Sequence, residues 1–222
     1  MILKWLGMDI VNHLKSLKLV PVVGLPSVDA GRRLAELLLR CRLGVMEITY
    51  RTDCAPAAIE CITEEFPELI VIAGTVLSAE QVDHAVGCGV KGIVSPGFTR
   101  SLAGHCRRTG IPFFPGISTA SEVQAAREEE LFNLKFFPAS LSGGVKMIDL
   151  FKAIYRDVSL MPTGGITQDN LSDYLDRENV TCCGGTWLCP EELMLRDDWQ
   201  EIEKRVSSAV KLLEKRENNI QS

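Results

Sequence analysis

Apolar and polar positions alternate along the chain in a regular order. The first apolar run covers residues 19–24, and the segment after Ser27 then carries apolar residues at helical spacing. A short apolar run between turn residues is typical of a buried strand, and apolar positions three and four residues apart are typical of a helix with one buried face. The same pair of patterns recurs down the chain. It predicts strands at residues 19–24, 45–49, 69–73, 90–95, 111–115, 131–137, 158–163 and 180–183.

Amphipathic segments separate these runs and predict the helices. Ser27, Ser78 and Thr167 stand where helices are expected to begin. A hydroxyl at this position can accept a hydrogen bond from a backbone N–H that has no partner inside the helix. The last helix has two candidate starts, Glu191 and Trp199. The predicted helices cover residues 9–17, 27–41, 55–66, 78–86, 99–108, 119–129, 143–154, 167–176 and 191 or 199 to 215.

Eight strand–helix alternations predict an α/β protein with a parallel sheet. Eight such units close into a (β/α)₈ TIM barrel, so we expect one barrel domain over residues 1–222, with an extra N-terminal helix within residues 1–18. The polar tail at 216–222 is expected to fray. An open doubly wound sheet is the alternative. The glycine-rich dinucleotide turn of that fold is missing after the first strand, where Gly24-Leu25-Pro26 stands instead.

Composition narrows the possible partners. The 24 basic and 29 acidic residues give a net charge of −5, which disfavours an extended nucleic-acid surface. No stretch approaches the ~18 apolar residues of a membrane span, and the apolar start is too short for a signal peptide, so we expect a cytoplasmic protein. The eight cysteines form no C-x-x-C pair and are expected to be reduced and to fill core space.

The candidate chemistry lies at strand ends, where barrel enzymes carry their active sites. Lys135 stands alone among apolar and aromatic residues of the sixth predicted strand. Burial favours its neutral amine, which can attack a carbonyl carbon and form a Schiff base. A strand-end lysine whose amine reaches solvent is the alternative. On the second predicted strand, alternation places Glu47, Thr49 and Arg51 on one side. Glu47 could move protons beside the lysine, and Arg51 could bind a carboxylate or phosphate, although a structural Glu47–Arg51 ion pair is an alternative.

Two glycine pairs follow the last two predicted strands and point to an anion site. Gly164 and Gly165 open one loop, and Gly184 and Gly185 open the other, followed by Thr186. Glycines expose backbone N–H groups, and barrels often bind phosphate at these two loops. Turn glycines without a ligand are the simpler alternative. The three histidines fall in predicted helices, and no residues have metal-ligand spacing, so we expect no metal site.

Seven segments in order resemble the 2-keto-3-deoxy-6-phosphogluconate (KDPG) aldolase family, which includes enzymes acting on 4-hydroxy-2-oxoglutarate (KHG). The resemblance extends from about Val20 to Trp199. The seven segments are Glu47-Ile48-Thr49-Tyr50-Arg51-Thr52, Ala73-Gly74-Thr75-Val76-Leu77, Ser95-Pro96-Gly97, Pro115-Gly116-Ile117-Ser118-Thr119, Lys135-Phe136-Phe137-Pro138-Ala139, Pro162-Thr163-Gly164-Gly165-Ile166 and Gly184-Gly185-Thr186-Trp187-Leu188.

The resemblance implies a class I aldolase, a homotrimer without metal or organic cofactor, that binds a small 2-oxo acid. It implies that Lys135 forms the Schiff base and that Glu47 is the acid and base. It further implies that Arg51 and Thr75 contact the substrate carboxylate, that Pro96 and Phe137 shape the pocket, and that Thr163 approaches the hydroxyl-bearing carbons. The residues implied in phosphate binding are Gly164, Gly165, Gly184, Gly185 and Thr186.

Three departures from the family pattern concern the far end of the substrate. Thr186 stands where many relatives have serine, Tyr50 stands where leucine is common, and the loop 140–144 differs slightly. The side chain of Tyr50 is expected to face away from Glu47. Thr163 favours the gluconate substrate, because relatives that act on the galactonate epimer tend to carry an apolar residue there. A phosphogalactonate aldolase, an imine-free barrel enzyme and a non-catalytic sensor of phosphorylated sugar acids stay open as alternatives.

Overall fold

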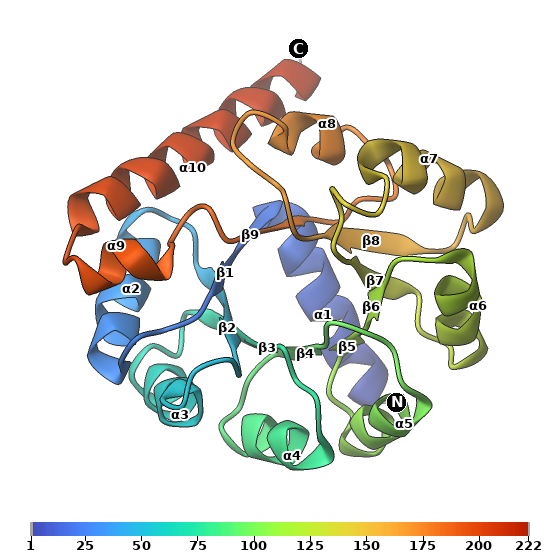
Figure 1. Cartoon of the computed structure of the whole chain (residues 1–222), viewed down its shortest axis with the longest axis horizontal. Coiled ribbons are helices and arrows are strands. Elements are labelled where there is room, and N and C mark those ends of the chain that lie inside the picture. The colour runs from blue at the N-terminus through green and yellow to red at the C-terminus, as the bar shows by residue number, and fades with distance from the viewer. Residues whose placement is uncertain (1, 222) are drawn as a thin grey trace.

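The computed structural model describes residues 2–221, with the side chains of residues 2–9, 217 and 219–221 excepted. Strands and helices alternate along the chain, as predicted (Figure 1). The strands are β1 (Leu19–Val23), β2 (Val45–Thr49), β3 (Ile70–Gly74), β4 (Gly92–Val94), β5 (Phe113–Phe114), β6 (Gly116–Ile117), β7 (Asn133–Phe136), β8 (Ser159–Pro162) and β9 (Cys183–Gly185). The helices are α1 (Ile2–Leu17), α2 (Val28–Arg40), α3 (Ala55–Glu65), α4 (Ala79–Gly87), α5 (Arg100–Thr109), α6 (Ala120–Glu128), α7 (Gly144–Ile154), α8 (Leu171–Leu175), α9 (Glu191–Leu195) and α10 (Trp199–Gln221).

The strands pair in parallel in two sheets. One has the order β5-β4-β3-β2-β1-β9 and the other the order β6-β7-β8. Parallel bridges from Leu160 to Val180 and from Thr163 to Gly184 connect β8 to the segment around β9. Figure 1 shows the strands curving around a common centre with helices outside them and α1 behind them. The chain therefore has an α/β fold whose parallel strands form at least part of a barrel.

The predicted strands differ from the structure at two places. The fifth prediction, residues 111–115, overlaps only β5. Pro115, which has no N–H to continue the ladder, separates β5 from β6, and β6 lies beyond the predicted range. The eighth prediction, residues 180–183, was placed too early. Val180 forms only an isolated bridge, and the strand itself is Cys183–Gly185, which pairs with β1.

Two helix predictions also need correction. Thr167 does not cap α8, which begins at Leu171. Instead, the backbone N–H groups of Thr167 and Asn170 each donate to the other's side chain, at 2.8 and 3.4 Å, and form a turn before the helix. The two candidate starts of the last helix belong to two helices, α9 and α10. Helix α10 continues to Gln221, through the segment that was expected to fray, and Ser222 lies outside the described residues.

Helix caps and apolar burial explain why these segments fold as they do. Ser27 and Ser78 accept hydrogen bonds from the backbone N–H groups of Ala30 and Gln81, as predicted. The core is aliphatic and lies between the strands and the helices around them. All eight cysteines are free thiols, and burial raises the pKa of Cys106 and Cys182 to about 12. Within residues 2–221, no helix is long and apolar enough to cross a membrane.

Candidate active site

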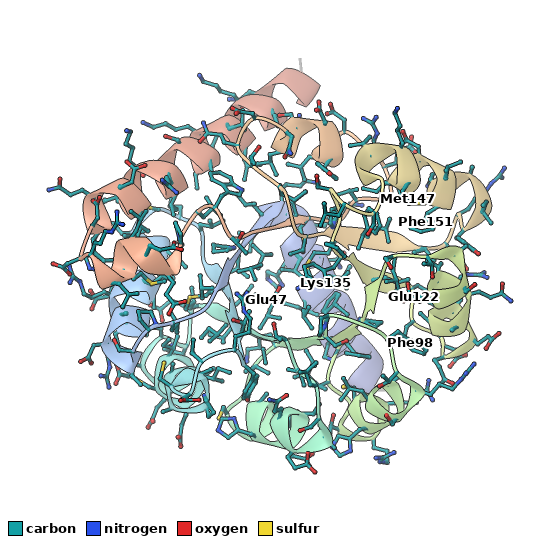
Figure 2. All side chains as sticks on the ribbon, viewed as in Figure 1. Glu47, Phe98, Glu122, Lys135, Met147 and Phe151 are labelled. Carbon is teal, nitrogen blue, oxygen red and sulfur yellow. The ribbon has the colours of Figure 1, made fainter. Side chains whose placement is uncertain are left out.

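Lys135 and Glu47 meet inside the ring of strands. Lys135 lies on β7 and Glu47 on β2, and the Lys135 Nζ donates a hydrogen bond to Glu47 Oε1 at 3.0 Å. Both residues are buried, with 5% and 0% of their surfaces exposed (Figure 2). Removing two charged groups from water is costly, so a buried pair of this kind points to function more than to stability.

The surroundings of the Lys135 amine and of the Glu47 carboxylate differ. Glu47 Oε2 is buried and has no hydrogen-bond partner among the described residues. The Lys135 Nζ lies 5.4 Å from the centre of the Phe137 ring, which forms an apolar wall beside the amine. A buried oxygen without a partner is unusual and needs an explanation, such as a ligand or a proton-transfer role.

Gly74 makes room for Glu47. It ends β3 and pairs with Thr49 on β2. A Cβ atom at this position would lie 2.6 Å from Glu47 Cγ and 2.8 Å from Glu47 Cδ, which real Cβ contacts essentially never show. In the sequence, Gly74 stands out only as part of the segment Ala73-Gly74-Thr75-Val76-Leu77 that resembles the family. The signal that could have found it is a glycine at the end of the strand next to the one that carries Glu47.

The residues implied to bind the carboxylate lie at neighbouring strand ends. Arg51 follows β2, and its Nε donates to Thr49 Oγ1 at 3.0 Å, so the alternative Glu47–Arg51 ion pair is not observed between these two described side chains. Thr75 follows β3 with a φ of +55°. A β-branched residue rarely adopts this conformation, and such strain costs about 1–3 kcal/mol and concentrates at functional sites. Pro96 follows β4, and its carbonyl packs against Gly116.

The four glycines predicted to open the phosphate loops each have a packing or backbone reason. Gly164 and Gly165 follow β8, whereas Gly184 and Gly185 lie within β9. Gly164 and Gly165 have φ values of +93° and +78°, which favour glycine. Gly184 forms a bridge to Thr163, and a Cβ atom there would lie 3.0 Å from Thr163 Cγ2. At Gly185 a Cβ atom would lie 2.9 Å from Trp187 Nε1. These reasons hold without a ligand. Gly184 and Gly185 are buried and pair with Val20 and Pro21 of β1, whereas Gly165 is exposed.

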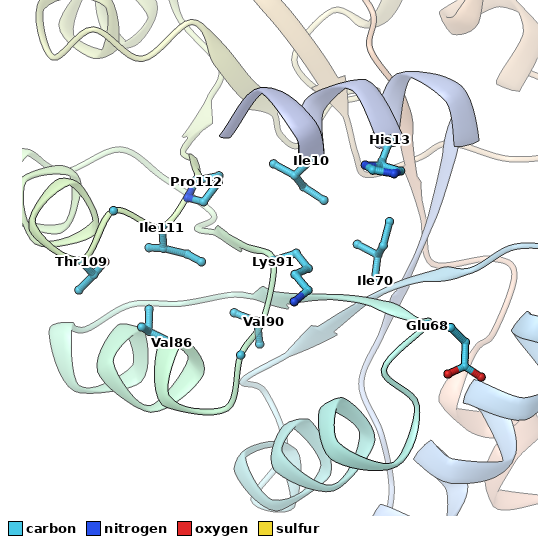
Figure 3. Close-up of a pocket in the computed structure, with 12 residues that line it drawn as sticks. Ile10, His13, Glu68, Ile70, Val86, Val90, Lys91, Thr109, Ile111 and Pro112 are labelled. Atoms are coloured by element: carbon cyan, nitrogen blue, oxygen red, sulfur yellow. The ribbon is translucent and has the colours of Figure 1, made fainter. Parts of the chain in front are cut away.

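Two cavities of about 570 Å³ lie at opposite ends of the strands. One is lined by residues at the carboxyl ends of β1, β2 and β9, and it brings Arg51 and Thr186 together. The other lies at the amino ends of β3, β4 and β5, where Ile10 and His13 of α1 face Ile70 and Lys91 (Figure 3). The second cavity contains none of the residues predicted to form the site.

Tyr50 and His105 contact residues of the helices around the strands. Tyr50 faces α4, where its hydroxyl lies 2.8 Å from His84 Nδ1, and burial raises the pKa of Tyr50 to about 12. His105 contacts Asp83 on the helical surface at 2.7 Å. In the part of the chain that the structure describes, no three His, Cys, Asp or Glu side chains cluster as they would around a metal ion.

The arrangement agrees with a comparison against known families. The KDPG and KHG aldolase family model matches residues 10–205, which is most of the chain. This protein belongs to the KDPG and KHG aldolase family. The matched range contains Lys135 and Glu47.

Individual relatives cover nearly the whole chain. A 2-dehydro-3-deoxy-phosphogluconate aldolase of Haemophilus influenzae is 37% identical over 92% of this chain and 97% of its own. A KHG/KDPG aldolase of Escherichia coli K12 is 38% identical over 86% of this chain and 90% of its own. A KDPG aldolase of Legionella pneumophila, solved with pyruvate captured as a covalent carbinolamine, superimposes with a TM-score of 0.84. It is 33% identical and the match covers 86% of this chain and 93% of the Legionella chain.

Proposed function

We propose that this protein is a class I aldolase that cleaves KDPG to pyruvate and glyceraldehyde 3-phosphate, and KHG to pyruvate and glyoxylate. The observation that carries the proposal is the buried contact of 3.0 Å between Lys135 Nζ and Glu47 Oε1. A carbinolamine is the adduct of an amine with a carbonyl carbon. Pyruvate held in that form by the Legionella pneumophila aldolase therefore supports amine chemistry at the corresponding centre of this chain.

The proposed reaction begins at the amine. Neutral Lys135 attacks the C2 carbonyl carbon of the 2-oxo acid, and the carbinolamine loses water to give a protonated imine. The imine then accepts the electron pair of the C3–C4 bond, while Glu47 takes the proton of the C4 hydroxyl. An aldehyde leaves, the enamine gains a proton at C3, and water releases pyruvate and the free lysine. The covalent imine takes the role of an organic cofactor, and Glu47 supplies general acid–base catalysis of about 10²–10⁴-fold.

The remaining site residues have proposed roles in binding. Arg51 and Thr75 would hold the substrate carboxylate, and Pro96 and Phe137 would enclose the pyruvyl carbons. Thr163 would approach the hydroxyl-bearing carbons. Gly165 is exposed in the loop after β8, and the exposed Thr186 follows β9 and lines the cavity that also contains Arg51. Both observations support an anion site at these two strand ends. The residues proposed to bind the phosphate are Gly164, Gly165, Gly184, Gly185 and Thr186.

We further propose a closed (β/α)₈ barrel formed by a single domain, with α1 as the extra N-terminal helix. The parallel bridges between β8 and the β9 segment, and the short step from β5 to β6 across Pro115, support closure. We also propose a homotrimer in the cytoplasm. Leu150 and Ile154 support self-association, because they are 57% and 64% exposed and lie four residues apart on one face of α7.

Trapping with borohydride tests the proposed chemistry. Pyruvate plus borohydride should add a reduced, irreversible adduct to Lys135, detected by intact-mass and peptide mass spectrometry. Lys135→Ala should form no adduct and lose aldol cleavage by at least about 10³-fold, because no other group can form the imine. Lys204→Ala changes an exposed lysine of α10 and should behave like the wild type. Near-normal turnover by a folded Lys135→Ala variant would contradict the proposal.

A further inference from the structure

Thr49 carries a buried hydroxyl and stands between Glu47 and Arg51 in the sequence. It ends β2, two residues after Glu47, and only 1% of its surface is exposed. A buried hydroxyl is costly unless its hydrogen bonds are satisfied. The Thr49 Oγ1 has two partners: it donates to the carbonyl oxygen of Val23 at 2.8 Å and accepts from Arg51 Nε at 3.0 Å.

The direction of both hydrogen bonds follows from the chemistry of the groups. An arginine Nε can only donate, and a carbonyl oxygen can only accept. The single hydroxyl proton of Thr49 must therefore go to Val23, and its lone pair must face Arg51. Val23 ends β1, the neighbouring strand, so the hydroxyl connects the rigid end of β1 to the side chain of Arg51.

Of the three guanidinium nitrogens of Arg51, Nε donates a hydrogen bond to Thr49. Within the described residues, Nη1 and Nη2 of Arg51 have no hydrogen-bond or ion-pair partner. Other arginines of this chain are neutralised by carboxylates, such as Arg127 by Asp157 at 2.7 Å and Arg205 by Glu201 at 2.8 Å. The hydrogen bond at Nε restrains the orientation of the Arg51 guanidinium, and Arg51 lines the cavity at the carboxyl ends of β1, β2 and β9. A planar pair of donors matches a carboxylate.

We propose that Thr49 is a positioning residue that aims Arg51 at the carboxylate of the 2-oxo acid. Thr49 itself does not touch the substrate. It limits the rotation of the Arg51 side chain, so less conformational entropy is lost when the carboxylate binds. This inference rests on the proposed function, which identifies the bound anion as the carboxylate of the 2-oxo acid. The orientation of Arg51 rests on the two hydrogen bonds of Thr49.

The test separates positioning from folding. Thr49→Val keeps the shape of the side chain and removes the hydroxyl, so KM for the 2-oxo acid should rise about 10-fold or more, while kcat stays within about threefold. Thr49→Ser restores the hydroxyl and should restore KM. Thr63→Val is the matched control, because the Thr63 hydroxyl bonds only to backbone carbonyls inside α3. A lower kcat with an unchanged KM in Thr49→Val would overturn the proposal.

A double variant tests whether Thr49 acts through Arg51. In the Arg51→Ala background, Thr49→Val should cause no further rise in KM, because the group that it positions is gone. Additive effects would overturn the proposal.

Thermal stabilisation by pyruvate separates a failure of this proposal from a failure of the proposed function. Pyruvate should raise the Tm of the wild type, and Thr49→Val should need about 10-fold more pyruvate for the same rise. If pyruvate stabilises the wild type but forms no borohydride adduct, the proposed aldolase reaction is contradicted. The role of Thr49 would still be decided by comparing how Tm depends on pyruvate concentration in the wild type and in Thr49→Val. Equal pyruvate dependence in both proteins would overturn the role of Thr49.

Discussion

A single glycine decides whether the Glu47 carboxylate fits beside Lys135. A Cβ atom at Gly74 would occupy the space of Glu47 Cγ and Cδ, and the backbone of Gly74 does not itself require glycine. Gly74→Ala should therefore displace Glu47 without straining β3. A displacement of about 1 Å at a reacting group can lower kcat/KM about 10²-fold.

This prediction is measured as kcat/KM for KDPG cleavage, with near-UV circular dichroism to confirm the fold. Gly44→Ala is the control, because the nearest heavy atom to a Cβ there lies 3.8 Å away. Full activity of the Gly74→Ala variant would show that Glu47 either can move freely or is not needed.

Helix α6 begins with a capping box that contains a titratable carboxylate, the side chain of Glu122. Glu122 accepts hydrogen bonds from the backbone N–H groups of Ser118 and Thr119 at 2.8 and 2.9 Å, and Thr119 Oγ1 accepts from the Glu122 N–H at 3.3 Å. Burial alone would raise the pKa of Glu122, but these hydrogen bonds outweigh it and lower the pKa from its usual 4.5. A carboxylate with a lowered pKa stabilises the fold above pH 4.5, and this stability is lost as the pH falls through its folded value.

Glu122→Gln should expose this contribution, because glutamine does not titrate. At pH 7 the variant should lose about 1 kcal/mol of unfolding free energy, measured with urea. The difference in unfolding free energy between the wild type and the variant should narrow as the pH falls below about 4.5. In that range Glu122 of the wild type is protonated first in the unfolded state and then in the folded state. Glu64→Gln is the control, because it changes an exposed glutamate of α3 and leaves the capping box of α6 intact. If this difference stays constant with pH, the capping box does not contribute to the pH dependence of stability.

Two large apolar side chains of α7, Leu150 and Ile154, are exposed on one face of the helix at the surface of the molecule. A mass of about three times the 24.5 kDa of the chain should be found by light scattering if the proposed homotrimer forms through this face. The double change Leu150→Glu and Ile154→Glu places charges where apolar side chains would be buried, and it should give a monomer.

Leu195→Glu is the control for the assembly experiment. Leu195 is 68% exposed and lies on α9, away from α7 in the chain, so its variant should remain a trimer. A wild type with the mass of one chain would contradict the proposed trimer. A trimer that survives both changes on α7 would place the interface elsewhere.

The sequence by itself determined the order of the elements and the identity of the chemical groups. Strands and helices differ in the period of their apolar positions, and caps such as Ser27 act within one turn, so local patterns were sufficient. Lys135 and Glu47 could be identified because a charged side chain in an apolar strand is conspicuous without any knowledge of its partner. Predictions were weakest where local signals were ambiguous, as at Thr167 and at the boundaries of β9.

Only the tertiary structure decided which of these groups meet. Lys135 and Glu47 lie 88 residues apart, and the curvature of the parallel strands brings them within 3.0 Å. Gly74 and Thr49 were not predicted as site residues, because their importance depends on what the neighbouring strand places against them. A strand pattern states which side chains share a face, but strand pairing and register decide the distances between them, and those distances decide the chemistry.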